Sequence, residues 1–555
     1  MRLLNNIIQT IYINPLCIGW LCLLFLILFV ESHSYAQDIK VSPSTETISN
    51  LRTSTIISDG SLENHDSVKI TITKLSGAVN SNFDEFAPVI SADGLMMIFT
   101  SNRPITKEAI KNGKSGVENI YVSYYDEITW KWSEARMLEN SVNRKGRNTS
   151  ATGIANDGQR MLIYRGDPDG NIYESDLSGE EWSEAVKLPK PINSRKYETS
   201  GSISPDGRTI YFISNRRGGQ GGLDIWRCQQ DNLGVWGKAE NLGPEINTPQ
   251  NEEGIFIHPD GKTLFFSSRG HNNMGGYDIF KSVFENGKWG RPVNLGAPIN
   301  TPDDDLCFVQ TADGNKAYYT SSLPDDAGKK HIYEINYKYF KKKNNGPKLT
   351  LVKGKVSDDT GKPIGADIEI TDNVKNSVIA NVKSNSVTGK YLVSLPSGIN
   401  YGLIVKRSGY LFYSENFDIP DSASFNQVKK DIPLEKITVG KKVILKNIFY
   451  DFGKASLRPE SRAELRQVVE LMDLNINLQI EISAFTDNIG TDEFNLILSQ
   501  ARAQSVVDYL FVAGIAKEQM VAKGYGETNP MATNETEAGR QLNRRTQIKI
   551  LGFMK

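Results

Sequence analysis

The chain has 555 residues, of which 39% are hydrophobic and 23% are charged, as in an ordinary globular protein. A chain of this length exceeds what one hydrophobic core supports, so about three or four domains are expected. The formal net charge of -1 excludes a global basic field that would attract nucleic acid or an acidic membrane. Only five histidines are available for a histidine-based metal or acid–base site.

The N-terminal segment has the features of a secretory signal peptide. Arg2 precedes an apolar block at residues 16–30, and Ser34-Tyr35-Ala36 then forms a small-x-small triplet. This order predicts export with cleavage after Ala36, which assigns residues 1–36 to the signal peptide. An uncleaved membrane anchor is the alternative, because the block is only a little shorter than a membrane span.

Cleavage would leave two cysteines in the exported chain, Cys228 and Cys307. Two cysteines do not make a disulfide framework in a protein of this size. Because they lie in non-adjacent repeat units, we expect them to be too far apart to pair.

An internal repeat follows residues 37–65, which we interpret as a linker. In each of five units an Asn precedes an Asp-Gly turn by thirteen or fourteen residues, and a β-rich run and an Ile-aromatic pair come after the turn. Five residues after each Asn stands Glu85, Asn148, Glu198, Glu252 or Asp305. The repeated Asn residues are Asn80, Asn143, Asn193, Asn247 and Asn300, and the turns begin at Asp93, Asp157, Asp206, Asp260 and Asp313.

Four short strands in each unit predict a β-propeller over residues 66–340, with five blades, or six as the alternative. The region resembles the bacterial propeller repeats of the TolB type, which define a fold and say little about the ligand. The fifth unit lacks the Trp-containing strand of the other four, so we expect residues 68–76 to supply the outer strand of the last blade. The repeated Asn and acidic residues are interpreted as closing turns between strands, with a ring-shaped ligand site as the alternative. The Trp residues are expected to pack in the core.

Two segments of this region could bind ligands. The Gly-rich loop 218–222 could hold a phosphate, but no Lys-Ser/Thr pair and no helix start follow it, so a hairpin turn is favoured. Asp303–Asp305 and the group Asp167, Asp169 and Asn171 could hold Ca²⁺. Asp305 occupies the acidic position of the repeat, which favours a turn-and-strand role. We therefore expect no metal and no cofactor.

Residues 341–348 (KKKNNGPK) are predicted to be a solvated linker. Alternating strands between Gly, Pro and Asp turns then predict a small β-sandwich over residues 349–436. This segment resembles the carboxypeptidase regulatory-like domain in Gly354-Lys355-Val356, Gly361-Lys362-Pro363, Gly389-Lys390-Tyr391 and Ser408-Gly409-Tyr410. The resemblance implies a spacer or interaction module without catalytic residues.

The C-terminal segment, residues 437–555, alternates strands and helices. Strands are predicted at residues 446–452, 478–483 and 546–551, and helices at residues 459–472 and 492–512. This order indicates a two-layer α/β domain.

The C-terminal segment resembles the OmpA-like peptidoglycan-binding domain. The matching stretches, in chain order, are Phe449-Tyr450-Asp451-Phe452, Thr486-Asp487-Asn488-Ile489-Gly490, Asn495-Leu496, Leu498-Ser499, Ala501-Arg502-Ala503, Lys523-Gly524-Tyr525-Gly526, Gly539-Arg540 and Asn543-Arg544-Arg545. The sequence departs from the family in having Ala484-Phe485 where Gly-His is usual, and this departure leaves both charged anchors in place.

The ligand that the resemblance implies is the diaminopimelate stem peptide of peptidoglycan, whose free end carries an ammonium and a carboxylate. Asp487 would bind the ammonium and Arg502 the carboxylate, because a guanidinium meets a carboxylate through two hydrogen bonds. Asn495, Asp451 and Asn488 would make secondary contacts, and Asn543, Arg544 and Arg545 would flank the cleft or brace the fold. In the alternative interpretation Asp487 caps a turn and Arg502 is an ordinary surface residue.

Together these features predict a non-enzymatic protein of the cell envelope, in the periplasm and associated with the outer membrane and cell wall. The propeller would contact other envelope proteins, and similar architectures link it to secretion or gliding machinery. The alternatives are a glycan receptor or a hydrolase with its site in the propeller. Against a hydrolase, the sequence contains no nucleophile elbow, no His-Glu-x-x-His and no paired-cysteine metal pattern.

We predict that the mature chain begins at Gln37, because the apolar block and the Ser34-Tyr35-Ala36 triplet together define a cleavage site. Mass spectrometry of the protein purified from the cell envelope measures this terminus directly. An intact chain that begins at Met1 in the inner membrane would contradict cleavage.

Overall fold

The computed structural model describes residues 51–56, 68–166, 169–231, 233–322, 328–339 and 347–554, with the backbone alone for residues 51–56. The expected signal peptide, Asp167 of the possible Ca²⁺ group and residues 341–346 of the expected linker lie outside the described residues. Among the helices of the described ranges, none has the length and apolar character needed to cross a membrane.

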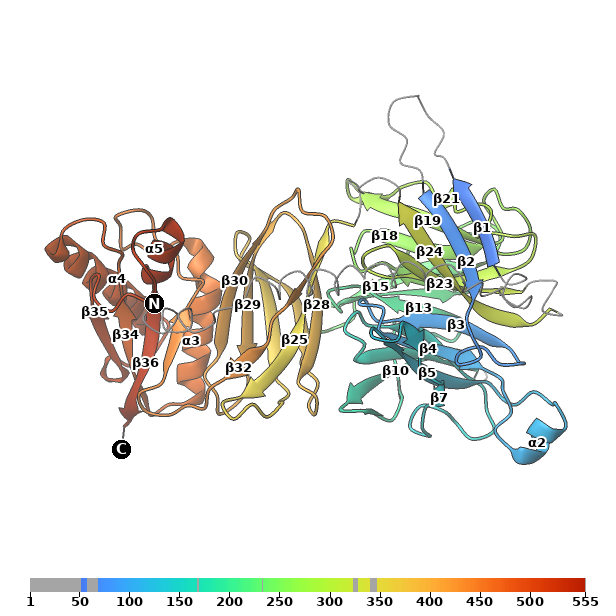
Figure 1. The fold of residues 1–555 in the computed structure, drawn as a ribbon, viewed down its shortest axis with the longest axis horizontal. Coiled ribbons are helices and arrows are strands. Elements are labelled where there is room, and N and C mark those ends of the chain that lie inside the picture. The colour runs from blue at the N-terminus through green and yellow to red at the C-terminus, as the bar shows by residue number, and fades with distance from the viewer. Residues whose placement is uncertain are drawn as a thin grey trace, which may run out of the picture. The chain divides into compact units, whose positions relative to one another are not determined.

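The repeat region forms five antiparallel sheets, one for each unit (Figure 1). The first sheet contains β3 (Glu85–Ile90), β4 (Met96–Ser101), β5 (Asn119–Asp126), β6 (Lys131–Trp132) and β7 (Arg136–Met137), and the second contains β8 (Thr149–Ile154), β9 (Arg160–Arg165), β10 (Asn171–Ser178), β11 (Glu181–Trp182) and β12 (Val186–Lys187). The third contains β13 (Glu198–Ile203), β14 (Thr209–Ser214), β15 (Asp224–Gln229) and β16 (Glu240–Asn241), and the fourth contains β17 (Glu252–Ile257), β18 (Thr263–Ser268), β19 (Asp278–Glu285), β20 (Lys288–Trp289) and β21 (Val293–Asn294). The fifth contains β22 (Asp305–Gln310), β23 (Lys316–Ser322) and β24 (Lys330–Tyr339), together with β2 (Val68–Lys74) and β1 (Leu51–Ile56) from the start of the region. A short helix, α2 (Lys107–Lys111), lies between β4 and β5.

The first strands of the five units form a closed ring. Contacts join β3 to β8, β8 to β13, β13 to β17 and β17 to β22, and β22 also contacts β3. We call these five strands the inner strands. The expected core packing of the repeated Trp residues is confirmed. Trp132, Trp182 and Trp289 are buried, and Trp236 is partly buried and packs against a core cluster.

A buried asparagine joins each sheet to the one before it. Asn143 accepts a hydrogen bond from the backbone N–H of Ile120 at 2.8 Å and donates to the carbonyl of the same residue at 3.1 Å. Asn80 makes the same pair of bonds with Ile332, both at 2.9 Å, across 252 positions of the chain. The remaining pairs are Asn193 with Ile172, Asn247 with Ile225 and Asn300 with Ile279.

The acidic residue of the repeat also makes hydrogen bonds and ion pairs within its own unit. Glu198 accepts hydrogen bonds from the N–H and hydroxyl of Ser194 and from the hydroxyl of Ser214, and it pairs with Arg216 at 3.0 Å. Asp305 likewise accepts bonds from the N–H and hydroxyl of Thr301. The interpretation of the repeated Asn and acidic residues as groups that close turns is confirmed at these positions.

The expected strand at residues 68–76 is present as β2, which pairs with β24 from Val68 opposite Tyr339 to Lys74 opposite Tyr333. Ile70 and Ile72 of β2 are buried in the core of the fifth sheet. β1 lies outside β2 in the same sheet, so a strand stands inside residues 37–65, where only a linker was expected. Edge pairing supplies the physical reason, because β2 has unpaired backbone groups that a further strand can satisfy.

Two four-stranded sheets follow and enclose one core. One contains β25 (Leu349–Asp358), β28 (Lys390–Pro396), β31 (Asn426–Lys429) and β32 (Ile432–Leu434), and the other contains β26 (Asp367–Asp372), β27 (Ser377–Lys383), β29 (Ile399–Lys406) and β30 (Tyr413–Ile419). Tyr401, Leu403 and Val405 of β29 alternate into this core, as the sequence pattern predicts.

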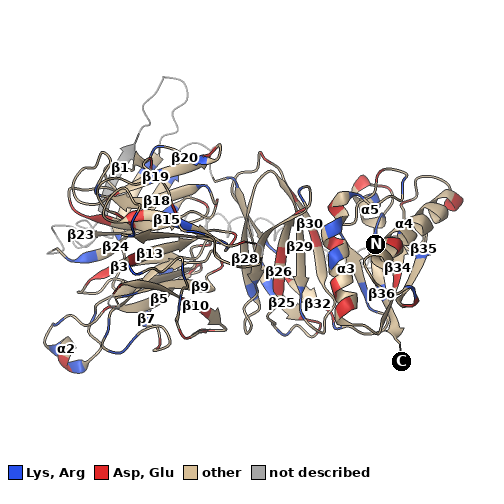
Figure 2. Ribbon diagram, turned by 180° about the vertical axis from the view of Figure 1, so that it is seen from behind, with Lys and Arg blue, Asp and Glu red and all other residues tan. Residues whose placement is uncertain are grey.

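The C-terminal segment forms a mixed sheet with helices packed on it (Figure 1). Its elements are β33 (Lys442–Leu445), η4 (Pro459–Ser461), α3 (Arg462–Leu474), β34 (Leu478–Ala484), α4 (Asp492–Val512), η5 (Lys517–Gln519), β35 (Met520–Gly524), α5 (Glu537–Asn543) and β36 (Thr546–Phe553). The sheet order is β33-β36-β34-β35, with β34 and β35 parallel. Figure 2 shows Lys and Arg interspersed with Asp and Glu along the ribbon, in keeping with the near-zero net charge.

The predicted strand at residues 446–452 is wrong, because β33 ends at Leu445 and the following residues form a loop. The polar groups of this loop find partners in side chains instead of in a neighbouring strand. The N–H of Phe449 donates to the hydroxyl of Ser461 at 2.8 Å, and the buried amide of Asn447 donates to Ser414 and Glu464.

The cysteines Cys228 and Cys307 are both free, as their places in the repeat indicate. Burial raises the pKa of the Cys228 thiol to about 11 and that of the Cys307 thiol to about 12, so neither is a reactive thiolate at neutral pH.

We predict that Asn80→Ala lowers the melting temperature of the protein and promotes aggregation. The change removes the buried bonds to Ile332 and to the carbonyl of Leu75, and an unsatisfied buried group costs on the order of 1–3 kcal/mol. Deletion of residues 37–76 should have a larger effect, because it also removes β2. Asn82→Ala, two positions away on an exposed side chain, is the matched control. Identical melting of Asn80→Ala and the wild type would contradict closure through this residue.

We also predict that Glu464 makes stability depend on pH. Its carboxyl is fully buried and accepts bonds from Ser414 and Asn447, and burial raises its pKa from 4.5 to about 7. Because the folded pKa is the higher one, this stability is present below pH 4.5 and is lost as the pH rises through 7, by up to about 3 kcal/mol.

Thermal melts at several pH values test this dependence. Glu464→Gln should narrow the difference in melting temperature between pH 5 and pH 8, because the neutral amide does not titrate. The exposed Glu493→Gln on α4 serves as the control and should leave the difference unchanged. An unchanged difference in Glu464→Gln would contradict the assignment.

Candidate functional site

Asp487 lies in the loop that leads from β34 to α4. Thr491 caps the helix by accepting a bond from the N–H of Phe494, and this fixes where the loop ends. The side chain of Asp487 is largely buried, with Oδ1 accepting from the N–H of Ile489 at 3.1 Å and Oδ2 from Arg544 at 2.6 Å. A carboxylate has about four acceptor sites, so these two bonds leave room for a ligand.

Arg502 projects from α4 and is held in place from two sides. Its Nε donates to the carbonyl of Lys454 at 3.0 Å, and its guanidinium carbon lies 4.9 Å from the centroid of the Tyr450 ring. Burial lowers the pKa of Arg502, and the nearby Arg544 adds to this, while Tyr450 and Asp487 oppose it. The guanidinium still carries its charge, and the bond to Lys454 uses only one of its five N–H groups.

The charge of Asp487 acts to raise the pKa of the Arg502 guanidinium, although the two side chains are not paired with each other. Among the hydrogen bonds and ion pairs of the described residues, none joins the two side chains; the partner of Asp487 is Arg544. An acid and a forked base that are near one another but not bound to each other can each bind a separate group of one ligand. This arrangement suits a ligand with an ammonium at one point and a carboxylate at another.

The three secondary residues have different surroundings. Asn495 is almost fully buried, and its amide donates to the carbonyl of Asp487 at 3.2 Å and to Glu527 at 3.0 Å, so it supports the loop from below. Asp451 is exposed and lies 3.5 Å from the ammonium of Lys454, whose carbonyl holds Arg502. Asn488 is exposed beside Asp487.

Sequence reasoning did not identify Arg544 as the partner of Asp487. Arg544 follows α5 and also pairs with Glu537 at 2.6 Å, and these hydrogen bonds outweigh burial and raise its pKa. The Asn543-Arg544-Arg545 stretch was the only sequence feature that pointed to Arg544. Its first residue, Asn543, is fully buried and bonds Met531, Ala532 and Asn534, which makes it a brace.

The departure at Ala484-Phe485 affects packing next to the site. Phe485 is buried, stacks on Tyr525 with ring centroids 4.9 Å apart, and lies 3.6 Å from the guanidinium carbon of Arg545. Arg545 therefore braces this face of the sheet.

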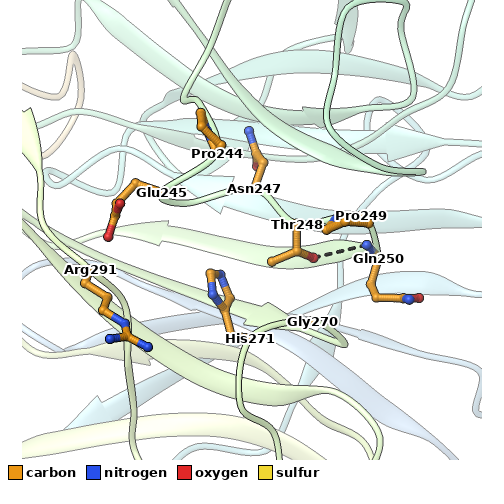
Figure 3. Close-up of a pocket in the computed structure, with 9 residues that line it drawn as sticks. All are labelled: Pro244, Glu245, Asn247, Thr248, Pro249, Gln250, Gly270, His271 and Arg291. Atoms are coloured by element: carbon orange, nitrogen blue, oxygen red, sulfur yellow. Dashed lines mark hydrogen bonds between the residues drawn. The ribbon is translucent and has the colours of Figure 1, made fainter.

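A surface pocket of about 370 Å³ lies in the repeat region, and Figure 3 shows the residues that line it. Three of its polar residues have hydrogen-bond partners within the repeat region. Asn247 bonds Ile225, Thr248 accepts from the N–H of Gln250 at 3.1 Å, and the ring of His271 contacts the carbonyl of Ile246 at 2.9 Å. We assign no function to this pocket.

Comparison with known proteins places the C-terminal segment. Residues 449–544 match the OmpA family. This segment is 43% identical over 108 residues to outer membrane protein A of Bordetella avium and 36% identical over 104 residues to outer membrane porin F of Pseudomonas fluorescens. Each match covers 19% of this chain, and it covers 55% and 32% of the two relatives.

Solved structures match the same segment. The peptidoglycan-associated lipoprotein from Burkholderia pseudomallei is 31% identical, with 19% of this chain and 86% of that chain covered and a TM-score of 0.18. The cell wall anchor of the T6SS from Pseudomonas aeruginosa is 30% identical, with 20% and 80% covered and a TM-score of 0.18. Residues 449–544 thus form an OmpA family domain in the C-terminal part of the chain, and the two curated relatives named above are outer membrane proteins by name.

Proposed function

We propose that this protein is anchored non-covalently to peptidoglycan through its C-terminal domain, and that it has no enzymatic activity of its own. The observation that carries the proposal is that Asp487 and Arg502 lie near each other within an OmpA family domain. Each side chain is held by other residues and is not bonded to the other. Asp487 binds the ammonium and Arg502 the carboxylate at the free end of diaminopimelate, with Asn495, Asp451 and Asn488 in supporting roles.

The proposal gives Arg544 the task of holding Asp487 in position. An aspartate whose Oδ1 accepts from the Ile489 N–H and whose Oδ2 accepts from Arg544 keeps its orientation before the ligand arrives, so less entropy is lost on binding. Tyr450 and the carbonyl of Lys454 do the same for Arg502.

The other two regions serve as a scaffold in this proposal. The ring of five sheets is a β-propeller that contacts other envelope proteins, including those of secretion or gliding machinery. The two-sheet segment is a carboxypeptidase regulatory-like spacer between the propeller and the wall-binding domain. The protein works in the periplasm, next to the outer membrane and the cell wall.

We predict that Asp487→Ala and Arg502→Ala each abolish co-sedimentation of the full-length chain with purified diaminopimelate-type peptidoglycan. Loss of one partner of a desolvated charge pair costs on the order of 2–5 kcal/mol, which lowers affinity by roughly thirty-fold or more. Circular dichroism and melting temperature establish that the variants remain folded. Asp508→Ala and Arg462→Ala, which alter exposed charges on α4 and α3, are the matched controls and should sediment like the wild type.

A second arm assigns the two charges to the two ligand groups. Peptidoglycan with lysine in place of diaminopimelate keeps the ammonium and lacks the carboxylate. The wild type should bind it weakly, and Arg502→Ala should bind it no more weakly than the wild type does. If both site variants sediment with diaminopimelate-type wall as the wild type does, the assignment of the site is wrong.

A further inference from the structure

The inner strands of the repeat region line a partly open cavity of about 400 Å³. Residues from all five inner strands line it, so it lies inside the ring that these strands form. This volume falls in the range of about 300–1,000 Å³ that is typical of sites for small ligands. The cavity is separate from the site at Asp487.

Each inner strand has a break in its pairing register where it borders the cavity. A small residue stands at each break, and these residues are Ala87, Thr152, Ser200, Gly254 and Cys307. Three of them, Ala87, Gly254 and Cys307, have positive φ values of 50°, 58° and 56°. Crowding explains part of this pattern, because a Cβ on Gly254 would lie 2.7 Å from the backbone nitrogen of Cys307.

Crowding does not explain the polar groups on the cavity wall. The hydroxyls of Thr152 and Ser200 are buried and have no hydrogen-bond partner within the described part of the chain. Buried polar atoms are normally paired, so two unpaired hydroxyls on neighbouring strands of one cavity call for a partner from outside.

Glu253 adds a carboxylate to the same wall. It accepts one hydrogen bond, from Thr199 at 3.1 Å, and forms no ion pair with any described residue. The repeat does not require an acid here, because the corresponding positions of three other units hold Phe86, Thr199 and Leu306. Burial raises its pKa to about 7, against the opposing influence of Thr199 and Lys330.

The rest of the lining is apolar apart from a few charges. Phe86, Phe256, Phe308 and Leu306 supply much of the apolar surface, while Glu118 and Asp304 are further acids and Lys330 is the one base among the lining residues. The ammonium of Lys330 lies 5.4 Å from the centroid of the Phe86 ring. Asp304 is paired with Arg269 at 3.4 Å, and the remaining acids, Glu118 and Glu253, still outnumber the one base of the lining.

We propose that this cavity binds a primary ammonium group carried on a short apolar chain. The ammonium donates its three N–H bonds to Glu253, Ser200 and Thr152, and the apolar chain packs on the phenylalanine rings. A free aliphatic amine and the lysine side chain of a partner protein both present this chemistry.

Calorimetric titration of the full-length chain with n-hexylamine tests the proposal, with n-hexanol and hexanoate as neutral and anionic probes of similar size. Hexylamine should bind, hexanol more weakly, and hexanoate not at all. Equal binding of all three, or preference for hexanoate, would overturn the proposal, because the site would then recognise the apolar chain or serve Lys330.

Variants locate the binding. Glu253→Gln should lower the affinity for hexylamine by roughly tenfold to a hundredfold, as expected for loss of a bond to a charged group. Thr152→Val keeps the shape of the side chain and should lower it by a smaller factor, which provides a second test if Glu253→Gln does not fold. Unchanged affinity in either folded variant would overturn the assignment.

Two controls separate this site from other acids. Glu285→Gln changes an exposed carboxylate at the end of β19 and should leave hexylamine binding unchanged. Asp487→Ala should also leave it unchanged, so failure of the wall-binding proposal and failure of this one are distinguishable. Loss of hexylamine binding in Asp487→Ala would place the amine in the C-terminal domain and overturn the proposal.

The peptide acetyl-Gly-Lys-Gly-amide identifies the source of the ammonium. Binding as strong as that of hexylamine assigns the cavity to a lysine side chain from a partner. Binding of hexylamine alone assigns it to a free amine, and both results support the ammonium chemistry.

Discussion

The repeat region depends on one interaction, the two-sided hydrogen bond between a buried asparagine and the backbone of an isoleucine in the preceding sheet. The asparagine accepts a hydrogen bond from the N–H of that isoleucine and donates one to its carbonyl, which also accepts from a leucine N–H, as Ile120 does from Leu138 at 2.9 Å. When Asn80 makes the bond with Ile332, the first unit meets the last. The ring, the partly open cavity among its inner strands and the place of β2 all follow from this closure.

The C-terminal domain uses charge in a different way. Its charged residues are held apart by neighbours, with Asp487 bound to Arg544 and Arg502 held by Tyr450 and Lys454. A direct pair between Asp487 and Arg502 would satisfy both charges and compete with a ligand. In the proposed site both side chains stay available to a ligand, at the expense of some stability, because partly buried charges are costly when incompletely paired. Rigid support of this kind is what a binding site for a small zwitterionic group requires.

The two proposed sites differ in how they relate to pattern. Asp487 and Arg502 belong to the motifs of an OmpA family domain, so the sequence alone indicates them as candidate site residues. Glu253, Thr152 and Ser200 break the repeat or stand at its register shifts, and they come together only because five strands converge on one axis. In a repeat architecture, the residues that depart from the pattern are those that packing leaves free for function.

The sequence by itself determined the units, their strand content and the strand that closes the ring, because hydrophobic alternation, turn residues and motif spacing are local signals. It placed α4 at the observed residues 492–512, yet it wrongly predicted a strand at residues 446–452. That segment is a loop, in which the N–H of Phe449 donates to Ser461 and the side-chain amide of Asn447 donates to Ser414 and Glu464. Only the tertiary structure decided that Arg544 holds Asp487, that Phe485 stacks on Tyr525, and that a cavity lies among the inner strands. These contacts join residues distant in the chain, and their energies depend on three-dimensional packing that no local pattern records.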